Sequence, residues 1–106
     1  SIVLDFPIFM TGEIDGTVYL HKGNRTFGVG NVEVQVIDEL GRVLQTVETA
    51  YDGFYIISKI PFGEYHLRIS KSQLNKLNLK PVADEPMELN SDDPFLSGYD
   101  FTLESN

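Results

Sequence analysis

The stretch that decides the fold is residues 51–69, YDGFYIISKIPFGEYHLRI. It begins with a turn at Asp52-Gly53, because glycine accepts a positive φ and aspartate bonds its neighbouring backbone. Residues 54–57 are aromatic and β-branched, as strands prefer, and apolar side chains alternate with polar ones over 64–69. Proline and glycine in the connection between these segments predict a tight return. Two successive strands are therefore expected here.

Three more strands are predicted upstream of this pair. In the first, Ile14, Gly16, Val18 and Leu20 alternate with polar residues and so share one face. The second covers about 32–37 and the third about 42–50, and the turn between them ends in Gly41, which suits a hairpin.

Downstream, short strands are expected near 87–89 and over 99–104, and 70–78 is expected to form one or two helical turns capped by Ser70 or Ser72. Turns at this spacing predict an all-β, antiparallel Greek-key sandwich of about seven strands, Ig-like or transthyretin-like in architecture. The residues expected in its core are Val18, Val34, Val36, Tyr55, Ile57, Tyr65, Leu67 and Phe101.

Length and composition predict one soluble domain. The chain has 106 residues, 42% of them hydrophobic, and no cysteine, which excludes a disulfide framework and a thiolate zinc site. Residues 12–106 are expected to form a single sandwich, with 1–11 as a connector or edge strand. The apolar opening is shorter than the roughly 20 residues that span a bilayer, so no membrane span is expected. A first residue of Ser1 predicts a piece of a larger protein.

The net charge of −8 is unevenly distributed. Residues 81–106 hold seven acids and no base, and no basic stripe occurs elsewhere. An acidic domain repels phosphate backbones, so nucleic acid is not an expected partner.

The motifs of the first two thirds carry a family resemblance. They are GEIDGTV at 12–18, GVGNVEV at 28–34, DGFYII at 52–57 and IPFGEYHL at 60–67. Over 12–69 the chain resembles the carboxypeptidase regulatory-like domain, a transthyretin-like sandwich. It departs from that pattern at Phe62, where the family has a second proline, and over everything after Ser70.

The resemblance implies a noncatalytic module attached to a larger bacterial envelope or secreted protein. We therefore expect a structural or protein-contact role, with an outer-membrane assembly protein of the usher type as one specific parent. The expected location is extracellular, periplasmic or at the cell surface. The expected partners are neighbouring domains of the parent or another envelope protein.

The sequence gives little sign of catalysis. His21 and His66 have no serine, cysteine or second histidine at a useful spacing, so no enzyme activity, cofactor or metal is expected. The alternative is a ligand-binding module for carbohydrate or calcium. Calcium prefers hard oxygen ligands, which the acidic surface of Asp84, Glu85, Glu88, Asp92 and Asp93 offers. The absence of tryptophan weakens the carbohydrate alternative.

Four apolar residues occupy positions where the strand alternation predicts an outward face. They are Tyr19, Ile37, Phe54 and Ile56. A contiguous exposed apolar patch marks contact with another domain or partner. The alternative is that residues 70–98 or the N-terminal run cover them.

Overall fold

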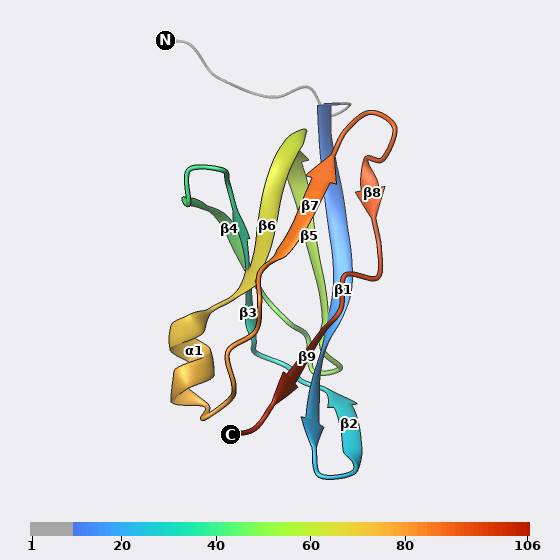
Figure 1. Ribbon diagram of the computed structural model, residues 1–106. Helices are drawn as coiled ribbons and strands as arrows, with labels where there is room; N and C mark the ends of the chain where they lie inside the picture. The colour runs from blue at the N-terminus through green and yellow to red at the C-terminus, as the bar shows by residue number, and fades with distance from the viewer. Residues whose placement is uncertain (1–9) are drawn as a thin grey trace.

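The computed structural model describes residues 10–106, so residues 1–9 of the expected connector lie outside the described part. The chain forms a β-sandwich with one short helix (Figure 1). Its elements are β1 (Thr11–Lys22), β2 (Arg25–Gly28), β3 (Glu33–Ile37), β4 (Val43–Glu48), β5 (Phe54–Pro61), β6 (Gly63–Ile69), α1 (Lys71–Lys76), β7 (Glu85–Leu89), β8 (Phe95–Leu96) and β9 (Phe101–Glu104).

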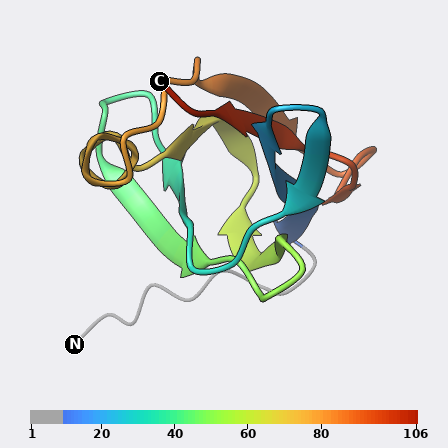
Figure 2. The same cartoon turned by 90° about the horizontal axis from the view of Figure 1, so that it is seen from below.

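Two sheets face each other across the core, as the view along the long axis shows (Figure 2). One has the order β4-β3-β6-β7 and is antiparallel throughout. The other is built on β1, which pairs antiparallel with β2 and β5 on one side and parallel with β8 and β9 on the other. The all-β sandwich expected from the sequence is confirmed, with the last two strands running parallel to the first.

Apolar or small residues alternate with polar ones along β1, so one face of the strand is buried against the core. Ile14, Gly16 and Val18 are buried, whereas the residues between them are only partly covered. Apolar side chains from both sheets meet there in one core. Its fully covered members include Ile14, Val18, Val34, Val36, Ile57, Ile60, Leu67, Leu89 and Leu103.

Seven of the eight residues expected in the core are buried. The difference is Tyr65, which is half-buried because its ring packs against the core while its hydroxyl donates to the Pro61 carbonyl at 2.6 Å near the sheet end. A tyrosine in a sandwich combines an apolar body with a polar tip and so favours the boundary of the core.

The helical turns predicted after β6 are present as α1. Ser70 caps the helix, because its hydroxyl accepts from the backbone N–H of Gln73 at 3.4 Å. Leu74 anchors the helix in the core, where it is 3% exposed. The Gln73 amide also bonds the backbone of Asn31 and Glu33, which fixes α1 to the start of β3.

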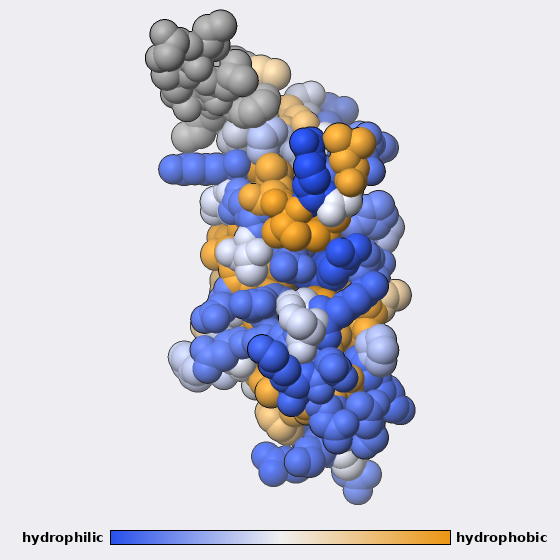
Figure 3. Space-filling model, turned by 90° about the vertical axis from the view of Figure 1, so that its left-hand side faces the viewer, coloured by the Kyte–Doolittle hydropathy of each residue, from blue (hydrophilic) through white to orange (hydrophobic). Residues whose placement is uncertain are grey.

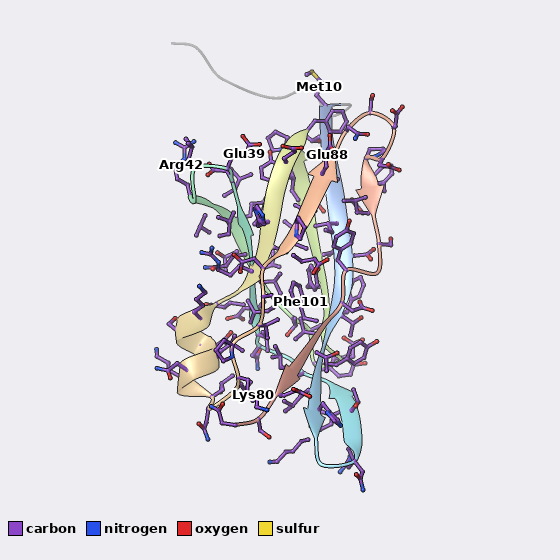
Figure 4. All side chains as sticks on the ribbon, viewed as in Figure 1. Met10, Glu39, Arg42, Lys80, Glu88 and Phe101 are labelled. Carbon is purple, nitrogen blue, oxygen red and sulfur yellow. The ribbon has the colours of Figure 1, made fainter. Side chains whose placement is uncertain are left out.

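The described residues form an elongated body of 51 × 23 × 21 Å. Met10 lies at one end of the long axis, and the C-terminus lies near the other, below Lys80 (Figures 1 and 4). The chain therefore enters and leaves near opposite ends.

Core burial predicts an asymmetry between two identical substitutions. Leu67→Ala removes a fully buried side chain and should lower the free energy of unfolding by about 2–5 kcal/mol. Leu40→Ala, at a position that is 76% exposed, should change it by less than about 0.5 kcal/mol. Urea unfolding measures both, and equal losses would contradict the assigned faces.

Candidate contact surfaces

The first candidate surface is the outer face of the five-stranded sheet. Phe54 and Ile56 of β5 stand opposite Thr17 and Asp15 of β1, and they are 42% and 45% exposed. Tyr19 follows on the same face of β1 and is half-buried. These three residues form a short apolar strip on one sheet. Phe95 of β8, 71% exposed, pairs with Glu13 farther along that sheet.

Ile37 does not belong to this strip, which corrects the expected patch. It lies in β3 of the other sheet and is 2% exposed. The register of β3 with β4 shifts between Val36 and Ile37, and both of these residues are buried. Ile37 is covered in the middle of its sheet, between Val43 and His66 on the neighbouring strands. Strand alternation alone does not reveal such a bulge.

A second apolar surface, outside the expected patch, lies on the β3–β4 hairpin. Leu40, Val43 and Leu44 are 76%, 50% and 43% exposed. Figure 3 shows the side of the molecule that lies on the left in Figure 1, and hydrophobic side chains gather on its upper half. β4 is an edge strand, so one side of it has no sheet neighbour. The sequence carried no signal for this surface, because the edge position of β4 is set by the topology of the sheet.

The five acids of the expected acidic surface are spread over one strand, β7, and the two loops that flank it. Asp84 is the most constrained, because Arg68 of β6 donates from Nη2 to Oδ2 at 2.9 Å and from Nε to both oxygens at 3.1 and 3.2 Å. These bonds hold the pKa of Asp84 below its ordinary value. Asp84 is therefore one partner of an ion pair that joins β6 to the loop before β7. Within residues 10–106, the other four acids of this surface form no ion pair.

The remaining acids lie farther along the chain. Glu85 and Glu88 are exposed on β7, and Asp92 and Asp93 form the tip of a loop in which the Asn90 side chain accepts from both of their backbone N–H groups at 2.9 Å. Within residues 10–106, no group of three or more histidine or acidic side chains could hold a metal ion.

A shallow hollow lies near the upper end of the four-stranded sheet. Glu39 and Glu88 border it (Figure 4), together with Glu64, His66 and parts of Tyr65, Pro86, Met87 and Tyr99. Glu64 stands directly opposite Glu88 in the β6–β7 pairing. Like charges in this position are destabilising unless they are solvated, which is consistent with the exposure of both side chains.

Two groups that could do acid–base chemistry, His21 and Tyr55, have hydrogen-bond partners within the sandwich, whereas His66 borders the hollow beside Glu64. His21 Nδ1 lies 3.3 Å from Glu104 Oε1 at the exposed lower end of β1. Burial raises the pKa of the Tyr55 hydroxyl well above its ordinary value, and this hydroxyl donates to the Tyr99 carbonyl at 2.7 Å. A tyrosine in that state is a neutral donor that ties β5 to the C-terminal segment. The Ser97 hydroxyl donates to the Asp15 carboxylate at 3.4 Å on the exposed surface. No histidine contacts a serine or threonine hydroxyl in the hydrogen bonds of residues 10–106.

The Arg68–Asp84 pair predicts that wild type and Asp84→Asn differ in free energy of unfolding by an amount that depends on pH. The folded-state pKa of Asp84 is lowered, so the pair stabilises the fold above the unfolded value of about 3.9 and is lost as the pH falls through the lower folded value. Asp84→Asn should cost about 0.5–1 kcal/mol at pH 7, and the difference from wild type should close below about pH 4. Asp92→Asn, in the exposed loop, is the control. A difference that persists at low pH would contradict the pairing.

The acidic surface predicts a salt response without cation selectivity. At physiological ionic strength, exposed charges are screened over about 8 Å, so sodium chloride should raise the melting temperature by weakening repulsion among carboxylates. Calcium and magnesium at matched ionic strength should act alike. A rise specific to calcium that Asp92→Asn or Asp93→Asn abolishes would instead establish a calcium site.

Solved structures with a similar fold include several pilins. The minor pilin GBS52 of the Gram-positive pathogen Streptococcus agalactiae aligns with a TM-score of 0.71 at 16% identity, covering 93% of this chain and 46% of that one. BcpA, the major pilin subunit of Bacillus cereus, aligns with a TM-score of 0.71 at 14% identity over 92% of this chain and 31% of that one. At these identities the likeness concerns the fold alone. The chain spans less than half the length of either pilin.

No curated protein sequence matches the chain. One family model does match, over residues 10–85, which is more than two thirds of the chain. It describes the second β-sandwich domain of BOS complex subunit NOMO1-like proteins. The resemblance inferred from the sequence is thus confirmed for the transthyretin-like sandwich, while the family itself differs from the carboxypeptidase regulatory-like domain. The chain belongs to the NOMO1-like second β-sandwich domain family.

Proposed function

We propose that this domain is a noncatalytic spacer and contact module within a larger, multidomain protein. The observation that carries the proposal is the position of the two ends of the described chain, near opposite ends of a 51 Å long axis. Neighbouring domains joined at these ends would be held apart by the length of the sandwich. A single sandwich over 12–106, with residues 1–11 as a connector or edge strand, is part of this proposal.

The chemistry of the described residues supports a noncatalytic role. The buried side-chain polar atoms of residues 10–106 all have hydrogen-bond partners, so none of them is left unpaired for a substrate to bind. The buried Tyr55 hydroxyl and Thr49 hydroxyl both bond backbone groups of the sandwich. No helix in this part of the chain is long and apolar enough to cross a bilayer.

The names of the similar proteins support a structural role. The matched family describes a second sandwich domain of a complex subunit, which indicates that such domains occur in series. The similar solved structures include pilin subunits, which are built into assemblies. We propose an exported parent, with this domain extracellular, periplasmic or at the cell surface. An usher-like outer-membrane protein is the most specific form of this proposal.

The contact role uses the two exposed apolar surfaces. The strip of Tyr19, Phe54 and Ile56 lies on the side of the sandwich, and so does the β3–β4 hairpin, whereas the chain ends lie at its poles. Lateral surfaces remain accessible when neighbouring domains occupy the poles. Binding of carbohydrate or calcium is the alternative, and its calcium form has no cluster of ligands among residues 10–106 to support it.

The spacer role predicts how much longer a two-domain fragment of the parent is than this domain alone. Small-angle X-ray scattering of a parent fragment with this domain and one adjacent sandwich should give a maximum dimension that exceeds that of the 106-residue chain by about the length of a sandwich. For this domain that length is 51 Å. The control is the chain alone. Growth close to the short axes of 23 and 21 Å would mean side-by-side packing and would overturn the spacer role.

A further inference from the structure

We propose that the pairing of the first and last strands makes this domain resistant to tension applied between its two ends. The inference rests on the spacer function proposed above and deepens it, because a spacer between two domains transmits any tension between them along its axis. It rests on the direction, the continuity and the anchoring of the contact between β1 and the C-terminal segment.

The direction of the pairing sets how force acts on it. β9 runs parallel to β1, with Val18, Tyr19, Leu20 and His21 opposite Phe101, Thr102, Leu103 and Glu104. Tension on the upper end of the molecule pulls β1 upward from its N-terminal end. Tension on the lower end pulls β9 downward from its C-terminal end (Figure 1). The two strands are therefore pulled past each other along their length.

Sliding and peeling differ in how the hydrogen bonds share the force. Backbone bonds between strands lie across the strand axis, so sliding strains the whole ladder at once. Peeling instead concentrates the force on one bond at a time. An antiparallel last strand would bring its C-terminal end to the same pole as Met10, and tension would then peel it away.

The contact continues above β9, along most of β1. The Glu13 N–H donates to the Pro94 carbonyl at 2.9 Å, and β8 then pairs with Glu13 and Ile14. Farther down, the Tyr99 N–H donates to the Asp15 carbonyl at 3.1 Å. The Asp100 carboxylate accepts from the Thr17 N–H at 2.8 Å, just before the β9 ladder begins.

Two glycines of β1 make this close approach feasible. A Cβ at Gly12 would collide with the Pro94 carbonyl oxygen, and a Cβ at Gly16 would collide with the Tyr99 carbonyl oxygen. Both glycines face inward on β1, where the C-terminal segment crosses it. The absent side chains thus let the last segment lie directly on the backbone of the first strand.

The last strand is also anchored on its other sides. Phe101 (Figure 4) and Leu103 are 5% and 0% exposed, so sliding would pull two apolar side chains out of the core. The Lys80 N–H donates to the Glu104 carbonyl at 2.8 Å, on the edge of β9 that faces away from β1. Asn106 bonds Asn78 through both its backbone and its side chain.

Single-molecule force spectroscopy with two pulling directions tests the proposal. The chain has no cysteine, so introduced cysteines define the attachment points. Met10→Cys with Asn106→Cys loads the strands along their length. Asn24→Cys, in the turn after β1, with Asn106→Cys instead peels β9 from its lower end. We expect a several-fold higher unfolding force in the first direction. Equal forces in both directions would overturn the proposal.

A matched pair of substitutions tests the contact itself. Asp100→Ala, which removes the acceptor of the Thr17 N–H, should lower the unfolding force in the lengthwise direction and leave the peeling force unchanged. Asp92→Ala, in the exposed loop, should leave both forces unchanged. A lengthwise force that Asp100→Ala does not lower would refute a role for this contact, and urea unfolding of each variant separates a loss of stability from a loss of resistance.

The outcome is independent of the scattering test. If the fragment is elongated and the two forces are equal, the spacer function stands and the proposed resistance of the β1–β9 pairing is wrong. If the fragment is compact and the forces differ, the resistance of the β1–β9 pairing stands and the spacer function is wrong.

Discussion

The hydrogen-bond ladder of β1 is the constraint on which the rest of the structure depends. This strand pairs with β2, β5, β8 and β9, so it satisfies backbone groups on both of its edges along most of its 12 residues. Its inward face supplies Ile14 and Val18 to the core. The sheet that β1 organises covers the inner face of the four-stranded sheet. The burial of Leu67 and Val36 on that inner face therefore depends on β1.

The sequence was informative where one local pattern determines one local structure. The alternation along β1, the turn at Gly53 and the cap at Ser70 each depend on neighbouring residues, and each is present as expected. Long-range pairing is different. A period of two says which face a residue occupies, and it does not say which strand lies alongside or in which direction. The parallel placement of β9 was therefore not predictable from its own residues.

The surface was predicted less well than the core. Ile37 is buried in the middle of its sheet, between Val43 and His66 on the neighbouring strands, although it is not part of the core cluster. Leu40, Val43 and Leu44 are exposed on the β3–β4 hairpin, whose strand β4 lies at an edge. Whether an apolar residue on a strand is covered depends on the neighbours of that strand, which are set by topology. The acidic segment illustrates the same limit, since Asp84 found its base in β6, outside the segment.

The position of β9 at the end of the chain also has a consequence for how the domain forms. Val18 and Phe101 are neighbours in the ladder although they are 83 positions apart in sequence. Contacts of such high contact order form slowly. As the polypeptide leaves the ribosome, β1 carries an unpaired edge until the final strand has been synthesised. An open edge is a template for another strand, and in a series of similar sandwiches the nearest one belongs to the next domain. Exchange of last strands between neighbours is thus the characteristic misfolding hazard of this topology.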